Sequence, residues 1–226
     1  MSIHSKILVH WTGKPDIEDE PVSDQPRLFI QRLHDYYQNG LFMKRTEENS
    51  IRFWRLKNIV RLCFTEIRLS QAENHAKRSG KLGIGFSRDF IINRDGRPVI
   101  YIPFEPYDGL LERSLTQIWE KSIDDETPKP MKYVLGFVKR MWNEHGDMNF
   151  EEMEWRIVYD ENPKNDNITK GNNEGEFRFK FAPKDVTVII FPDEATRKMA
   201  LCDSTLQIYF SQHTPILVTI DDCKDF

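Results

Sequence analysis

EMEWRIVY, residues 152–159, is the stretch of sequence that decides the fold. In a strand, successive side chains point to opposite faces, so Glu152, Glu154 and Arg156 share one face. The other face carries the apolar side chains Trp155, Ile157 and Tyr159. Like charges on one face raise each other's pKa unless water or a cation such as Arg156 answers them. The stretch therefore predicts a strand whose acids form either a solvated Glu/Arg ladder or a chemical site.

Other runs rich in β-branched and aromatic residues, bounded by turn residues, predict further strands. These segments are Ile7–Trp11, Ile51–Trp54, Val60–Ile67, Leu82–Phe86, Pro98–Ile102, Phe177–Phe181, Val186–Phe191 and Ile216–Ile220. Asp95-Gly96 predicts the turn before the Pro98–Ile102 strand. The polar segment 160–176 predicts a mobile loop.

Helical spacing of apolar residues predicts the helices. The first expected helix contains Phe29, Leu33, Tyr36 and Tyr37 and ends at Asn39-Gly40, and the second runs from a Ser70–Glu73 capping box to Ser79, with Gly80 after it. Two further helices are expected, one through Leu111, Leu115, Ile118 and Trp119 and one through Val134, Val138, Met141 and Trp142. A short last helix is expected after Asp193, which would cap it. Because helices interrupt a strand-rich chain without regular βαβ alternation, we expect an α+β fold.

Size and composition suit one large domain over residues 1–226, since 39% of the residues are hydrophobic and 15 are Phe. Net charge is −4, but residues 44–97 carry 13 Lys and Arg against 6 Asp and Glu, which can steer an anionic partner or reflect ordinary solvated side chains. Three widely spaced cysteines indicate neither a zinc site nor a disulfide framework. With no leader and no membrane-length apolar stretch, we expect a soluble cytoplasmic protein.

Several familiar sites are missing from the sequence. Gly83-Ile84-Gly85 lacks the third glycine and following helix of a dinucleotide fingerprint, and there is no Walker loop. The six histidines are isolated, and no G-x-S-x-G elbow is present. We therefore expect no metal site and no hydrolase of these classes.

A dispersed set of candidates remains. His10 lies toward the end of the first predicted strand, beside Trp11 and Thr12, Phe64-Thr65 lies near the end of a central one, and His75 lies on the capped helix. Each also has a purely structural explanation: a backbone-bonded histidine, ordinary strand filling, and a packing or solvent-facing histidine. Glu152 and Glu154 are harder to explain by structure alone.

Several motifs together resemble the AbiGi-like abortive-infection family, which is associated with phage defence and labelled an antitoxin in some systems. The resemblance covers roughly residues 7 to 160. Its motifs are Val9–Lys14, Leu62–Ile67, His75, Leu82–Phe86, Pro98–Tyr101 and Glu152–Arg156.

The same order also resembles a diverged ADP-ribosyltransferase of the DarT-like or CmdT-like toxin kind. That resemblance implies a split mixed sheet with flanking helices and NAD as substrate, without a metal. It assigns NAD binding to His10, Thr12, Phe64, Thr65 and His75. In this interpretation Glu154 stabilises the oxocarbenium-like centre formed when the nicotinamide–ribose bond breaks, and Glu152 positions or deprotonates the acceptor.

The leading hypothesis is a phage-defence toxin that transfers ADP-ribose from NAD to a nucleic acid such as RNA and is held in check by an antitoxin. The alternative is a non-enzymatic antitoxin or regulatory module that binds a partner protein. An NAD-hydrolysing effector stays open, and a nuclease is disfavoured because Glu152 and Glu154 lack the further ligands of a two-metal site.

Overall fold

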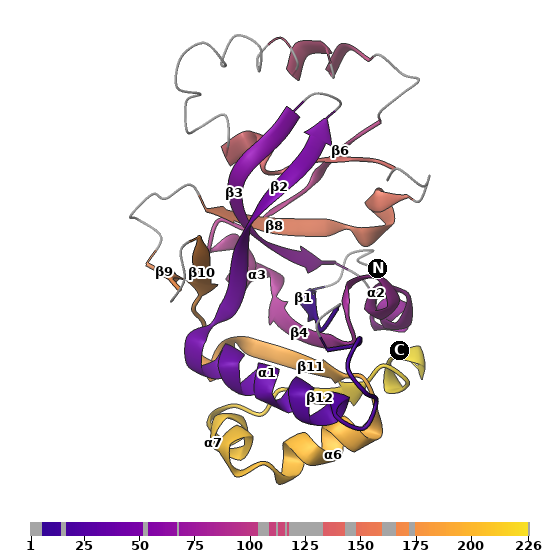
Figure 1. Ribbon diagram of the computed structural model, residues 1–226, viewed down its shortest axis with the longest axis vertical. Helices are drawn as coiled ribbons and strands as arrows, with labels where there is room; N and C mark the ends of the chain where they lie inside the picture. The colour runs from indigo at the N-terminus through magenta and orange to yellow at the C-terminus, as the bar shows by residue number, and fades with distance from the viewer. Residues whose placement is uncertain are drawn as a thin grey trace.

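The computed structural model describes the chain in segments, with α-helices, strands and short 3-10 helices (Figure 1). The described residues are 6–14, 17–51, 54–66, 68–103, 109–111, 113–115, 117, 133–142, 148–159, 166–171 and 175–225, with only the backbone for 44–51, 54–59 and 225.

A large mixed sheet dominates the described part of the chain. Its strand order is β12-β11-β4-β1-β3-β2-β10-β9. The bounds are β1 Ile7–Thr12, β2 Leu41–Ile51, β3 Trp54–Thr65, β4 Leu82–Ser87, β9 Ile168–Lys170, β10 Glu176–Phe179, β11 Val186–Phe191 and β12 Ile216–Thr219. β11 and β12 pair in parallel, whereas the other neighbours along this order are antiparallel. A mixed sheet with several helices confirms the coarse fold prediction.

The sheet branches at β3, the longest strand. The first half of β3 pairs with β2, and its second half pairs with β8 (Glu154–Tyr159), from Val60 opposite Tyr159 to Thr65 opposite Glu154. At the same end, Thr65 also lies opposite Val9 of β1. The end of β3 therefore lies between β8, the strand of the opening motif, and the N-terminal strand β1 (Figure 1).

A second, two-stranded parallel sheet joins β6 (Ile100–Ile102) to β7 (Val138–Arg140). It is attached to β8 through the preceding residue, because the Val99 amide donates to the Glu154 carbonyl at 2.8 Å. Short strand β5 (Arg97–Pro98) also pairs with β8. This arrangement sets β7 close to the first residue of β8.

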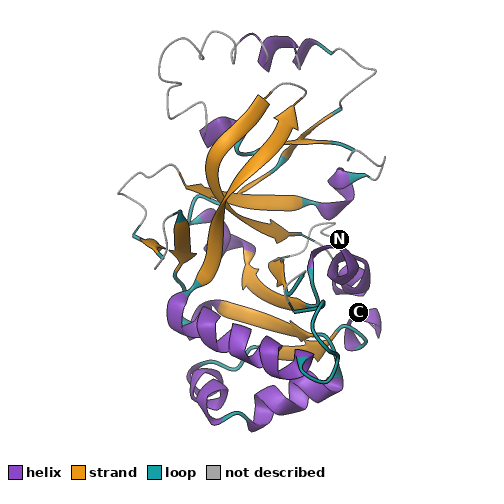
Figure 2. Cartoon of the chain, in the orientation of Figure 1, coloured by secondary structure: helices purple, strands orange, loops and turns teal. Residues whose placement is uncertain are grey.

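Helices cover the two faces of the large sheet (Figure 2). The helices α1 (Gln25–Asn39), α6 (Glu194–Cys202) and α7 (Ser204–Gln212) contribute to the main core with Leu8 of β1, while α2 (Ala72–Ser79) packs with Val9 and Trp11 in a second core. The remaining elements are α3 Arg88–Ile92 and the 3-10 helices η1 Leu69–Gln71, η2 Asn149–Glu152, η3 Pro183–Asp185 and η4 Asp222–Asp225. Because successive side chains of β1 point to opposite faces of the sheet, Leu8 packs in the main core, and Val9 and Trp11 pack in the second core.

The two glycines of β4 explain the Gly-Ile-Gly motif. A Cβ on Gly83 would lie 3.0 Å from Val9 Cγ1, and a Cβ on Gly85 would overlap Val188 Cγ1. These glycines let neighbouring strands bring large side chains over β4, so the motif serves packing.

Several local predictions were wrong. Ile51 and Trp54 belong to two strands rather than one: β2 ends at Ile51, β3 begins at Trp54, and the two residues pair with each other; residues 52–53 lie outside the described part. The capping box does not form, because Ser70 lies in η1 and the N-cap residue of α2, Gln71, makes no side-chain capping bond. The helix through Val138 is instead β7, preceded by helical residues 133–135.

Two further predictions fall partly outside the described residues. In the expected loop 160–176, residues 160–165 and 172–174 are not described, and β9 with the first residue of β10 occupies described positions of the same segment. In the expected helix from Leu111, positions 112, 116, 118 and 119 are not described. Asp193 does cap α6, accepting from the Thr196 amide at 2.7 Å.

The packing of β4 gives a stability prediction. Gly85→Ala should lower the free energy of unfolding by about 1–3 kcal/mol, because the added methyl group must displace buried Val188. Chemical denaturation at pH 7 measures the change. Lys81→Ala, a substitution just before the strand, serves as the control and should shift stability by no more than about 0.5 kcal/mol. Equal stability of Gly85→Ala and the wild-type chain would contradict this packing.

Candidate functional site

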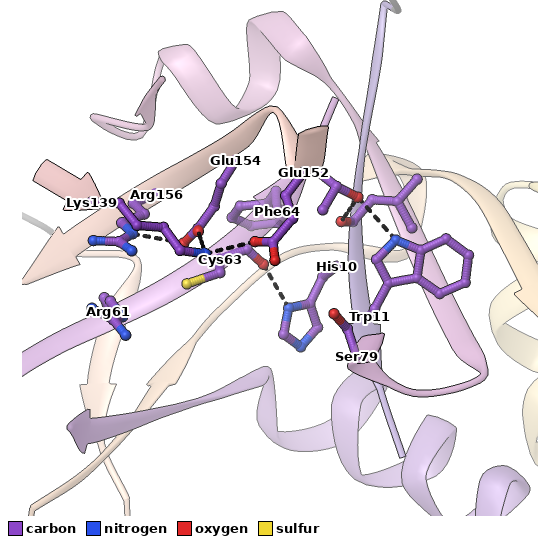
Figure 3. A pocket seen from close by; sticks show the side chains of 12 residues that line it. His10, Trp11, Arg61, Cys63, Phe64, Ser79, Lys139, Glu152, Glu154 and Arg156 are labelled. Carbon is purple, nitrogen blue, oxygen red and sulfur yellow. Dashed lines mark hydrogen bonds and ion pairs between the residues drawn. The ribbon is translucent and has the colours of Figure 1, made fainter. Parts of the chain in front are cut away.

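A pocket of about 300 Å³ opens where β1, β3, β7 and β8 meet the C-terminal end of α2 (Figure 3). Among its lining residues are five predicted from the sequence: His10, Phe64, Thr65, Glu152 and Glu154. The others are Val9, Trp11, Arg61, Cys63, Ser79, Lys139 and Arg156. The pocket thus joins residues that lie far apart in the sequence.

Glu154 stands at the centre of a buried ion-pair network. Its Oε1 accepts from Arg156 Nε at 2.6 Å, and its Oε2 accepts from Lys139 Nζ at 2.7 Å. Glu154 is 5% exposed and Arg156 only 1%. Burial alone would raise the pKa of Glu154, but Arg156 and Lys139 outweigh it and hold the pKa well below its usual range.

Lys139 joins the two glutamates of the opening motif (Figure 3). Its Nζ donates to Glu152 Oε2 at 2.6 Å as well as to Glu154. Burial works to lower the pKa of Lys139, but the two carboxylates overcome it and raise the pKa. The expected mutual repulsion of Glu152 and Glu154 is therefore answered by a shared cation.

We expected Glu152 and Glu154 to lie in one continuous strand, but they do not. Glu152 ends η2, and Met153 turns the chain with a φ of 42° before β8 begins at Glu154. The Glu154 amide then donates to Tyr101 Oη of β6 at 2.8 Å. The carboxylates meet because of this turn and Lys139, rather than through strand alternation.

Arg156 fastens β8 to the second sheet. Its Nη1 donates to the Gly136 carbonyl at 2.7 Å and to the Val138 carbonyl at 3.4 Å. The guanidinium is thus committed to backbone carbonyls as well as to Glu154. Such a residue positions neighbouring elements and keeps the Glu154 carboxylate in place.

His10 is a neutral hydrogen-bonding group at neutral pH. Its Nδ1 lies 2.9 Å from the Cys63 carbonyl, which can only accept, so Nδ1 carries the proton. Burial lowers the pKa of His10 to about 4, opposed by the bond to Cys63. Burial also raises the pKa of the Cys63 thiol to about 11, with Glu154 adding to the effect, so Cys63 is a poor nucleophile here.

Thr65 is tied into the strand framework. Trp11 Nε1 donates to Thr65 Oγ1 at 2.9 Å, and that hydroxyl donates to the Val9 carbonyl at 3.3 Å. Phe64 packs edge-on to His10, with ring centroids 6.0 Å apart. Both residues therefore hold the pocket wall together.

Two predicted binding residues lie away from this pocket's lining. Thr12 Oγ1 is 2.9 Å from Tyr36 Oη and accepts from Arg32 Nη1 at 3.2 Å, which directs it toward α1. His75 lines a different pocket, between α2 and η2. The structure thus separates these two side chains from His10.

The most consequential residue missed from the sequence is Lys139. The spacing of Val134, Val138 and Met141 suggested a helix, which hid the alternation of the short strand β7. Arg156 was recognised as a partner for the glutamates, but its bonds to Gly136 and Val138 depend on that same strand. No local sequence signal connects β7 to β8.

Within the part of the chain that the structure describes, no three His, Cys, Asp or Glu side chains gather in a way that would hold a metal ion. None of the described helices has both the length and the apolar character needed to cross a bilayer. The three cysteines are free thiols.

Comparison with known proteins adds one match. A family model described as "Putative abortive phage resistance protein AbiGi, antitoxin" matches residues 40–192, well over half of the chain. No curated protein and no solved structure matched. The matched range contains β3, β7 and β8, and hence Glu154, Lys139 and Arg156, but not His10.

The buried network predicts that Arg156→Met strongly destabilises the protein. Removing the guanidinium leaves Glu154 with Lys139 alone and strips two carbonyls of a donor, which should cost about 3–5 kcal/mol. Denaturant unfolding at pH 7 checks this. The matched substitution at an exposed arginine, Arg97→Met, should cost less than about 1 kcal/mol, and similar losses for both would contradict the network.

His10 predicts a pH dependence of stability. Its pKa is lower in the folded state than in the unfolded chain, so the unfolded state binds the proton first as pH falls. Stability should drop by about 2–3 kcal/mol between pH 7 and pH 4 from this residue, at about 1.4 kcal/mol per pKa unit. The drop should be smaller by that amount in His10→Asn, measured by urea unfolding across the range. Identical pH profiles would refute the assignment.

Proposed function

The chain belongs to the AbiGi family of abortive phage resistance antitoxins, and from that premise we propose that it is the neutralising, partner-binding component of such a system. In this role the protein binds a toxin and restrains it without chemistry of its own. The family match over residues 40–192 carries the proposal.

The state of Glu154 supports a binding role over an enzymatic one. A carboxylate that stabilises an oxocarbenium-like centre must turn an oxygen toward the substrate. Both oxygens of Glu154 are instead held by cations, the buried Arg156 and the half-buried Lys139. This pattern suits an ion-pair network that fixes the arrangement of β7 and β8.

Transfer of ADP-ribose from NAD to a nucleic acid is the second candidate. One observation favours it: His10, Phe64, Thr65, Glu152 and Glu154 line a single pocket. In this mechanism His10 binds the ribose, Phe64 and Thr65 contact the nicotinamide side, and Glu154 stabilises the transition state with Glu152 at the acceptor. Substrate would first have to displace Lys139 from the carboxylates.

A neutralisation experiment tests the leading proposal. The partner used is the protein encoded by the gene adjacent to that of this chain, expressed in bacteria with and without it. The chain alone should leave growth unchanged, the neighbour alone should arrest growth, and co-expression should restore growth. The two proteins should co-elute in size-exclusion chromatography.

Glu154→Gln separates the binding and enzymatic interpretations, since it removes the charge but keeps the shape. A folded Glu154→Gln protein should still restore growth. Growth arrest caused by the chain alone, and lost in Glu154→Gln, would overturn the antitoxin proposal and favour the toxin.

Labelled NAD tests the second candidate directly. Incubation of the purified chain with labelled NAD and total RNA, DNA or protein should transfer no label if the antitoxin proposal is right. Label transfer that Glu154→Gln reduces by at least about 100-fold would establish the enzyme instead. Nicotinamide release without any acceptor would indicate an NAD hydrolase.

A further inference from the structure

A second pocket, of about 570 Å³, lies between α2 and η2. One wall is α2, which presents Asn74, His75 and Arg78, and the other is η2 with Phe150 and the following Met153. This α2–η2 pocket shares no lining residue with the first. It therefore calls for a separate explanation.

His75 is a buried polar residue in the wall of this pocket. The residue is only 6% exposed, and its Nδ1 is buried without a hydrogen-bond partner. A buried polar nitrogen without a partner costs free energy, so this wall is not optimised for stability alone.

The apolar part of the pocket comes from Phe150 and Met153, which are 40% and 37% exposed. Met153 also adopts a left-handed φ of 42°, a conformation that costs a residue with a long side chain about 1–3 kcal/mol. Such strain persists where the surroundings enforce it, and functional sites are common among such places.

The η2 wall is held firmly before any ligand arrives. The Asn149 amide donates to the Met141 carbonyl at 2.7 Å, and the Met153 carbonyl accepts from the Glu66 amide at 3.1 Å. Glu152, between them, is bound to Lys139. A preformed wall loses little entropy on binding, which favours a docking site.

The charge of the pocket selects the ligand. Its lining holds two cations, Lys77 and Arg78, and one carboxylate, Glu151. Lys77 Nζ also pairs with Glu73, outside the lining, at 3.0 Å, so Arg78 is the more available cation. The contact between Arg78 and Glu151 is long, 3.8 Å, and exposed, so it offers little resistance to a competing carboxylate. An acidic group on the ligand would find complementary charge here, next to the apolar surface of Phe150.

From these features we propose that the α2–η2 pocket docks a peptide segment of the partner toxin that carries a carboxylate beside a large apolar side chain. The carboxylate meets Arg78, with Lys77 next to it, and the apolar side chain packs on Phe150 and Met153. The inference rests on the proposed antitoxin function and names the surface that performs it.

Affinity measurements with the purified full chain test this docking site. The probes are the intact toxin and 15-residue peptides that tile its sequence, with binding measured by fluorescence anisotropy. Phe150→Ser should weaken binding of the toxin and of one acidic peptide by at least about tenfold, or 1.4 kcal/mol. Met199→Ser, at an equally exposed apolar position (42%) on α6 that lines neither pocket, should leave the affinity unchanged.

The peptide chemistry is tested separately. Replacing the acidic residues of the binding peptide by their amides should weaken binding by about tenfold, as should Arg78→Gln in the chain. Toxin binding that Phe150→Ser and Arg78→Gln leave unchanged would overturn the docking site, while the antitoxin function would stand. Absence of toxin binding and growth rescue by the wild-type chain would overturn the proposed function and this inference together.

Discussion

The salt bridge between Glu154 and Arg156 holds the centre of the structure together. Burying two charges is costly, and the cost is recovered only when every remaining hydrogen-bonding group has a partner. Here Lys139 takes the second carboxylate oxygen, and the Gly136 and Val138 carbonyls accept from the guanidinium. The salt bridge itself lies within β8. Its two partners also bind Lys139, Gly136 and Val138, and these contacts fix how the two sheets meet.

The pocket lined by His10, Thr65 and Glu154 forms because of this junction between the two sheets and because the sheet branches at β3. Because β3 leaves β2 and pairs with β8, its last residues come between the acidic end of β8 and the N-terminal strand β1. His10 therefore faces the carbonyl of Cys63, and Glu154 lies opposite Thr65 in the ladder. Residues with shifted pKa values can gather around a pocket because of structural ion pairing as well as because of catalysis. Because both carboxylate oxygens of Glu154 already accept from Arg156 or Lys139, structural ion pairing is the favoured explanation for the shifted pKa values here.

Sequence patterns located the strands best where alternation is strong and apolar. The strands β1, β4, β8, β11 and β12 agree closely with prediction because each buries side chains on at least one face. β2 was missed because its second half, KRTEENS, is polar and its strand state comes from pairing with β3. β7 was missed because three residues are too few to show a period of two.

The candidate site was predictable only in part, for a related reason. Thr65 ends β3, Glu154 begins β8 and His10 lies near the end of β1, so their meeting could be anticipated from an assumed order of strands. Thr12 and His75 could not be placed, because their surroundings depend on α1 and η2. Lys139 comes from an element whose position is fixed by tertiary contacts alone.

The pairing of β3 with β8 also shapes how the chain reaches its fold. Trp155 donates to Glu66 across 89 positions of sequence, and the β3–β8 ladder closes a loop of similar length. Non-local closures of this kind slow folding, since the loop entropy is lost before the contacts form. During synthesis, one edge of β3 stays unpaired until β8 leaves the ribosome. A nascent chain arrested before residue 154 therefore exposes a strand edge that invites aggregation, which makes the late arrival of β8 the vulnerable stage in producing this protein.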